Sequence, residues 1–229
     1  PDVATRDYAT RDLQGTWYAH ILTSSGSPGY TRAKHTINSS GEVNSILSQP
    51  DGDTHSDSNM ATIASDGTVI LSGVNAHFFL NEAKNLLIGV GKDQDSEQDP
   101  WLHVAVKQSS IYSTSDLTGS WQTFSLSITS NGETDWEHGT LTVSPGGAFT
   151  HDWNNTDIGA GTSSGSLTLS SKGEVGVSGI TWLKGNMNSD KTFVAMTGSE
   201  GGSYTLLVFV KQKAVAFSQS DLTGSWQHY

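Results

Sequence analysis

Apolar and polar residues alternate over short stretches of the chain. Leu102, Val104 and Val106 stand two positions apart, and the same spacing recurs over residues 206–210, with apolar side chains on both faces. Successive side chains of a strand point to opposite faces, so a period of two predicts β-strands. No stretch keeps an apolar stripe at helical spacing, and the best helical candidate, residues 81–85, is short enough to be a turn. The pattern predicts an all-β chain with very little helix.

Clusters rich in Ser, Asn, Asp and Gly separate the alternating stretches. They occupy residues 38–41, 65–67, 144–147 and 171–173, and each ends in glycine. Glycine adopts the positive φ that tight hairpin turns require. The spacing of the turns predicts about seven to eight short antiparallel strands in each unit of an internal repeat.

The repeat is carried by the motif Asp-Leu-x-Gly-Ser/Thr-Trp, which occurs three times. Its tryptophans, Trp17, Trp121 and Trp226, are 104 and 105 positions apart. Residues 36–41 recur as residues 142–147, so the match extends into the body of the unit. Self-similarity at a fixed period predicts tandem structural units. The segments after each unit contain no Gly or Pro that would mark a loose tether, so the units are expected to touch.

The repeat divides the chain into three parts. Residues 1–115 are predicted to form the first unit, residues 116–220 the second, and residues 221–229 the first strand of a third. Short antiparallel strands in this number either close into a barrel or pack as a sandwich, since both arrangements shield the edges of a sheet. The expected fold is therefore all-β, with two tandem β-barrels or β-sandwiches.

The opening strand of each unit favours the barrel. Residues 15–18 read Gly-Thr-Trp-Tyr, and Gly119 and Trp121 repeat the pattern. These residues resemble the Gly-x-Trp motif that opens the first strand of lipocalins and avidins. The resemblance implies a barrel whose floor is plugged by the tryptophan and whose open end binds a small ligand. It covers a few residues per unit and assigns no ligand residue; the alternative is a strand start in which Trp fills one end of a core.

The third copy of the opening strand has no unit of its own. Asp221, Leu222, Gly224 and Trp226 repeat the motif near the end of the chain. An exposed Leu or Trp side chain loses roughly 1.5 to 3 kcal/mol relative to a buried one, so we expect this strand to dock. It either folds back on the second unit or completes a neighbouring molecule by strand addition, which would give head-to-tail fibres.

Charge and composition limit the partners. The formal net charge of −11 disfavours binding to nucleic acid and to anionic membrane surfaces. No apolar run approaches the roughly 20 residues that span a bilayer, so no membrane insertion is expected. The chain has no cysteine, which excludes disulfides and thiolate metal sites. It starts with Pro1, as expected of a processed product or an excerpt of a longer protein. We expect a secreted or cell-surface protein.

None of four compared histidines recurs between the units. The aligned pairs are His20 and Phe124, His35 and Leu141, His77 and Leu183, and His103 and Leu207. No phosphate-binding loop, nucleophile elbow or metalloprotease motif is present either. We therefore expect no enzyme, no catalytic residue, and no pocket in which His, Asp and Glu from distant strands converge.

Two tryptophans of the second unit stand close to histidines. Trp136 and His138 are two positions apart, and so are His151 and Trp153. The alternation of a strand places the members of each pair on one face. Aromatic and polar groups gathered in this way suit a sugar-binding face, with Trp136 and Trp153 as its platform. The alternative is that both tryptophans pack in the core or at its rim.

An acidic loop precedes the alternating residues 102–106. Asp93, Asp95, Glu97 and Asp99 stand two positions apart, and oxygen ligands at this spacing resemble the start of a calcium-binding loop. The glycine and the closing glutamate of an EF-hand are missing. Calcium is the one cofactor that the sequence suggests, with solvated turn carboxylates as the alternative.

The features that recur between the units build the architecture. Turn glycines, apolar strand residues and the opening motif are repeated, whereas candidate reactive residues are not. A repeated scaffold suits a non-enzymatic structural, assembly or adhesive role, with copies of the same chain or a cell-surface glycan as partner. The alternative is a lipocalin-like module that binds a small ligand or a carbohydrate.

Overall fold

The computed structural model describes residues 7–24, 28–92, 99–109 and 111–213. These residues form sixteen β-strands and two short helical turns, which confirms the predicted all-β class. No helix in these ranges combines the length and the apolar character needed to cross a bilayer.

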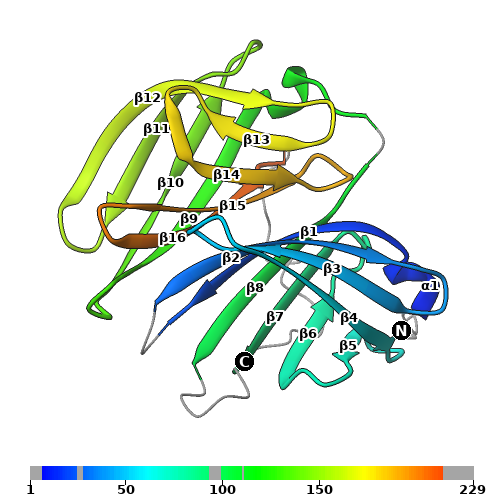
Figure 1. The fold of residues 1–229 in the computed structure, drawn as a ribbon. Helices are drawn as coiled ribbons and strands as arrows, with labels where there is room; N and C mark the ends of the chain where they lie inside the picture. Colours follow the sequence, from blue (N-terminus) through cyan, green and yellow to red (C-terminus); the bar gives the residue numbers. More distant parts are fainter. Residues whose placement is uncertain (1–6, 25–27, 93–98, 110, 214–229) are drawn as a thin grey trace, which may run out of the picture.

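The first eight strands close into an antiparallel barrel (Figure 1, blue to green). They are β1 (Gly15–Thr23), β2 (Gly29–Ile37), β3 (Glu42–Ser48), β4 (Thr54–Ile63), β5 (Thr68–Leu71), β6 (Ala76–Leu80), β7 (Leu86–Lys92) and β8 (Pro100–Lys107). Each strand pairs with the next, and β1 also pairs with β8. Closure leaves no free sheet edge, so short strands are stable in this order without a covering helix.

The next eight strands form a second closed barrel of the same order. They are β9 (Gly119–Thr129), β10 (Thr134–Val143), β11 (Ala148–Asn155), β12 (Gly159–Leu169), β13 (Glu174–Val177), β14 (Ile180–Met187), β15 (Phe193–Glu200) and β16 (Ser203–Lys211). β9 pairs with both β10 and β16 and thereby closes the ring. Of the two arrangements that the sequence left open, both units adopt the barrel, which is compatible with a calycin-like fold.

A short helical turn precedes the first strand of each barrel. The two turns are α1 (Thr10–Leu13) and η1 (Thr114–Leu117). The indole Nε1 of Trp17 donates a hydrogen bond of 2.7 Å to the carbonyl of Leu13, and Trp121 donates one of 2.8 Å to Leu117. All four side chains are fully or almost fully buried, so each tryptophan fills one end of its barrel beneath the turn.

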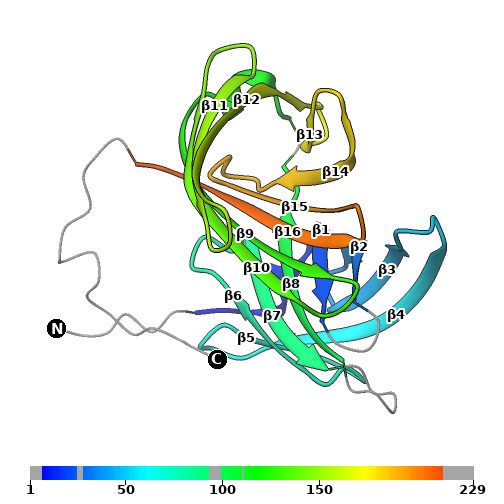
Figure 2. The ribbon, with the colours of Figure 1, turned by 90° about the vertical axis from the view of Figure 1, so that its left-hand side faces the viewer.

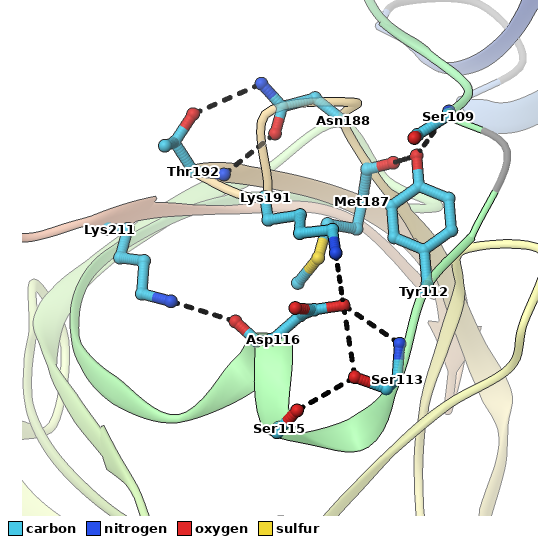
Figure 3. A network of polar contacts seen from close by, with 10 residues as sticks. All are labelled: Ser109, Tyr112, Ser113, Ser115, Asp116, Met187, Asn188, Lys191, Thr192 and Lys211. Atoms are coloured by element: carbon cyan, nitrogen blue, oxygen red, sulfur yellow. Dashed lines mark hydrogen bonds and ion pairs between the residues drawn. The ribbon is translucent and has the colours of Figure 1, made fainter.

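Polar contacts fasten η1 to the second barrel (Figure 3). The carboxylate of Asp116 accepts a hydrogen bond of 2.9 Å from the backbone N–H of Ser113 and forms an ion pair of 2.9 Å with Lys191. From β16, Lys211 donates a hydrogen bond of 2.9 Å to the backbone carbonyl of Asp116. The turn is therefore tied to the β14–β15 loop and to the last strand.

The first barrel repeats this arrangement. Asp12 forms an ion pair of 2.8 Å with Lys84, and its carbonyl accepts a hydrogen bond of 2.8 Å from Lys107. Lys84 and Lys191 also share a left-handed backbone, with φ of 59° and 62°. The aligned residues of the two units thus fasten the two helical turns in the same way.

The two barrels pack against each other through one apolar layer. β1 of the first barrel lies beside β15 and β16 of the second in both views (Figure 1 and Figure 2). The buried side chains of this layer are Leu22, Val104, Val106, Ile128, Ala195 and Leu206. The prediction that the units touch is confirmed.

Candidate functional site

The interior of the first barrel contains a cavity of about 440 Å³. Inward-facing residues from all eight strands line it. Buried Trp17 and Val43 belong to its apolar lining, while exposed Asp57 and Lys92 and half-buried Asn59 border it toward solvent. The cavity is therefore closed by core residues and rimmed by polar ones.

Two histidines meet inside this cavity. β1 pairs Trp17 with His35 of β2 and Ile21 with His103 of β8. The inward residue of β1 between these positions is Ala19, whose single methyl group leaves room for both rings. The two imidazoles stack, with their centroids 5.6 Å apart and their planes inclined by 16°.

Within the described residues, each imidazole has one buried nitrogen without a hydrogen-bond partner. Nδ1 of His35 lies 2.7 Å from the hydroxyl of Ser45. Nε2 of His35 and Nε2 of His103 make no hydrogen bond within the described part of the chain. A buried polar group left unpaired costs about 1 to 3 kcal/mol, so the two Nε2 atoms favour a bound molecule that can pair with them.

Burial keeps both imidazoles neutral. Desolvation lowers the pKa of His35 to about 4. The pKa of His103 lies well below its ordinary value, first because of burial and then because of the neighbouring His35 and His20. A neutral imidazole has one nitrogen that donates and one that accepts. At pH 7 the cavity therefore offers uncharged hydrogen-bonding groups.

Aromatic rings form the wall next to the histidines. Phe78 meets His103 edge-on with 5.3 Å between centroids, and Trp101 lies 5.7 Å from Phe78. Glycines on β7 make room for these rings, because a Cβ on Gly89 would lie 2.2 Å from the Phe78 ring and one on Gly91 2.3 Å from the Trp101 ring. The wall is thus apolar and held in place by its neighbours.

The second barrel has a different interior. Leu141 and Leu207 occupy the positions that align with the two histidines, and both pack in the apolar core of that barrel. His151 contacts the hydroxyl of Thr123 at 2.8 Å, and burial lowers its pKa. The stacked histidine pair therefore belongs to the first barrel alone.

The structure keeps the two Trp–His pairs of the second unit apart. Trp136 and His138 lie on the outer face of β10 with their rings stacked at 5.3 Å. His151 faces the interior, because it pairs with the core residue Leu141, and Trp153 shares that face. The predicted platform of Trp136 with Trp153 is wrong, because their strands direct them to opposite faces of the sheet.

The predicted calcium ligands are only partly described. Asp93, Asp95 and Glu97 lie outside the described residues, and Asp99 is buried just before β8. Within the described ranges, no group of three or more His, Asp or Glu side chains is placed to hold a metal ion. Calcium binding stays a prediction.

The proposed assembly residues Asp221, Leu222, Gly224 and Trp226 also lie outside the described part of the chain.

The sequence-based reasoning missed the histidine pair. The expectation that no pocket gathers His, Asp and Glu from distant strands is wrong in part. His35, His103 and Asp57 come from three strands and line one cavity, although no Glu is among its described lining residues. The signal was the failure of these histidines to recur. His35 and His103 align with Leu141 and Leu207, which face the core of the second barrel. The signal is incomplete, because His77 aligns with the buried Leu183 and is nevertheless exposed.

Comparisons with known proteins assign no family. No protein family and no curated protein matches the chain. A DUF3598-family protein of unknown function from Nostoc punctiforme has 11% identity and a TM-score of 0.29, over 89% of this chain and 98% of that one. Kievitone hydratase from Nectria haematococca has 10% identity and a TM-score of 0.29, over 91% and 92% of the two chains. MucB, solved in complex with MucA, has 11% identity and a TM-score of 0.21, over 87% and 89%.

Proposed function

We propose that the first barrel binds a small, mostly apolar organic molecule that carries a hydroxyl or carbonyl group. The observation behind this proposal is the pair of buried Nε2 atoms of His35 and His103, which have no partner within the described residues and belong to side chains that line a cavity. A polar group of the ligand would complete their hydrogen bonds. The apolar remainder would pack on Trp17, Phe78 and Trp101.

The size and charge of the cavity narrow the ligand class. Pockets for small organic ligands measure about 300 to 1,000 Å³, and this cavity has about 440 Å³. The histidines are neutral at pH 7, and the bordering Asp57 and Lys92 have opposite charges. A neutral molecule of two or three rings fits these conditions better than an ion.

Binding is preferred over the structural, assembly or adhesive role that the sequence suggested, because binding has a described site. That role, the absence of catalysis and the secreted or cell-surface location stay predictions. The segment invoked for assembly, residues 221–229, lies outside the described residues.

Two probes that differ by one hydroxyl test the proposal. 2-Naphthol and naphthalene share a ring system, and their binding can be followed by quenching of tryptophan fluorescence, since Trp17 and Trp101 line the cavity. We expect the protein to bind 2-naphthol about tenfold more tightly, which corresponds to one additional hydrogen bond of about 1.4 kcal/mol.

A matched variant locates the effect. His35→Leu combined with His103→Leu copies the residues of the second barrel, Leu141 and Leu207, so the fold is expected to persist. This variant should bind both probes with similar affinity, whereas His55→Leu, at an exposed position of β4, should behave as the unmodified protein. The proposal would be contradicted if the unmodified protein bound neither probe. It would also be contradicted if the double variant still bound 2-naphthol more tightly than naphthalene.

A further inference from the structure

The outer face of the second barrel carries a groove that the proposed function does not use. The groove measures about 580 Å³ and lies over β9, β10, β11 and β12. Its outward-facing polar lining consists of Gln122, His138, Thr140, Asp152, Asn154 and Thr162. It lies on a different barrel from the cavity of the histidine pair and on the outside of the sheet.

An exposed aromatic platform stands beside this groove. The side chain of Trp136 is 52% exposed, and its ring is nearly parallel to that of His138, at 22°. Phe124 of β9 is directly opposite His138 in the register and is 49% exposed. Large aromatic side chains are normally buried, so three rings together on an outer face need a partner to explain them.

The polar side of the groove is held in position by its own hydrogen bonds. Asp152 accepts a hydrogen bond of 2.8 Å from the hydroxyl of Thr162 and has further lone pairs to offer. Nδ1 of His138 is buried and makes no hydrogen bond within the described residues. Asn154 is exposed and adds an amide donor and acceptor.

We propose that this outer face binds a neutral, unsulfated oligosaccharide. The apolar C–H face of a pyranose ring would pack on Trp136, while its hydroxyls would exchange hydrogen bonds with Asp152 and Asn154. Among the described residues, no Lys or Arg lines the groove, and Asp152 is its only carboxylate. With a net charge of −11 for the whole chain, sulfated and phosphorylated ligands are disfavoured.

The shape of the face suits a chain rather than a single sugar. The lining residues Asp152, Asn154 and Thr162 are all exposed, so the groove can cover one side of a ligand without enclosing it. Binding therefore has to come from several consecutive sugar units that lie along the groove and over the rings of Trp136 and Phe124.

The experiment is a binding panel followed by calorimetry and by saturation-transfer NMR. The neutral probes are cellohexaose, mannohexaose, laminarihexaose and chitohexaose; a heparin hexasaccharide tests anionic ligands, and trilysine tests cationic ones. At least one neutral probe is expected to bind, and Trp136→Ala is expected to weaken that binding at least about tenfold. Trp136→Phe, which keeps a ring, should retain part of the affinity.

Control variants separate this surface from the rest of the molecule. Ile70→Ala removes a comparably exposed apolar side chain from the first barrel, where Ile70 is 58% exposed, and should leave oligosaccharide binding unchanged. The double variant His35→Leu with His103→Leu should also bind normally, so failure of the cavity proposal is distinguishable from failure of this one. The proposal is overturned if no neutral probe binds, if only the heparin fragment or trilysine binds, or if a folded Trp136→Ala variant binds as before.

Discussion

His20 and Asn186 join the two barrels through a hydrogen bond of 3.2 Å across their interface. The amide oxygen of Asn186 can only accept, so Nε2 of His20 donates, and the hydroxyl of Thr197 donates to Nδ1 at 3.0 Å. Burial, followed by the charge of nearby Arg32, lowers the pKa of His20 to about 3. A neutral imidazole with both nitrogens paired therefore lies within the apolar layer between the barrels.

This pairing predicts the effect of replacing His20. His20→Phe introduces the residue that the second unit has at the aligned position, but leaves the buried Asn186 and Thr197 groups without their partner. We expect the free energy of unfolding to fall by about 2 to 3 kcal/mol, measured by urea denaturation. The exposed His55→Phe should change it by less than about 0.5 kcal/mol. Equal stability of the two variants would show that the hydrogen bonds do not couple the barrels.

The buried histidines also predict how stability depends on pH. The pKa values of His20, His35 and His103 in the folded protein lie below the value of 6.5 for an unperturbed histidine. The unfolded chain therefore binds more protons below pH 6.5, and stability is lost as the pH falls from 6.5 toward 4. Each histidine contributes up to about 1.4 kcal/mol per pH unit in this window.

The measurement for this prediction is the urea midpoint between pH 7.5 and pH 4.5. The double variant His35→Leu with His103→Leu should lose about two thirds of the slope that the three histidines cause. His55→Leu removes an exposed histidine and should leave the slope as it is. An unchanged slope in the double variant would contradict the assignment of neutral imidazoles to the cavity.

The left-handed lysines give a third prediction. Lys191 has a φ of 62° and pairs with Asp116. Lys191→Ala and Lys191→Gly both remove the ion pair, but glycine adopts this backbone without the steric cost of a Cβ. We therefore expect the glycine variant to be about 1 kcal/mol more stable than the alanine variant, by thermal unfolding.

The order should reverse at a regular strand position. Lys184 is exposed in the middle of β14 and has no positive φ. Lys184→Gly should be less stable than Lys184→Ala, because glycine in a strand loses more conformational entropy on folding. If Lys191→Gly is also less stable than Lys191→Ala, the left-handed backbone does not determine which residue is favoured at position 191.

The sequence was sufficient for the architecture because the relevant signals are local. Alternation around Leu206 and the recurrence of the Trp17 motif as Trp121 are visible without a structure, and both follow from how strands and hairpins are built. Closure was expected only from the resemblance of the Gly-x-Trp opening strand to lipocalins and avidins. Whether eight strands form a barrel or a sandwich depends on whether β1 pairs with β8, and no local pattern encodes that long-range pairing.

The candidate site was harder to predict because it depends on the direction of single side chains. His35 and His103 are far apart in the sequence and meet only because β2 and β8 flank β1, where Ala19 leaves space. Conversely, Trp136 and Trp153 are close in the sequence but face opposite sides of the sheet. A position-by-position comparison of the two units would have selected His35 and His103, because both align with inward leucines. It would also have selected His77, which aligns with the buried Leu183 but is exposed.

The last prediction tests whether the aromatic wall of the cavity is held by a glycine. A Cβ on Gly91 would lie 2.3 Å from the ring of Trp101 and 2.7 Å from the backbone oxygen of Asn75, so relief requires both the indole and the backbone at Asn75 to shift. We expect Gly91→Ala to lower the free energy of unfolding by about 1 to 3 kcal/mol and to change the near-ultraviolet circular dichroism. It should also weaken 2-naphthol binding, because the displaced ring enters the ligand space.

In Gly176→Ala the closest atom is the rotatable hydroxyl of Thr168 at 3.1 Å, so this control should keep both stability and binding. Unchanged binding in Gly91→Ala would show that the ring of Trp101 does not shape the ligand space.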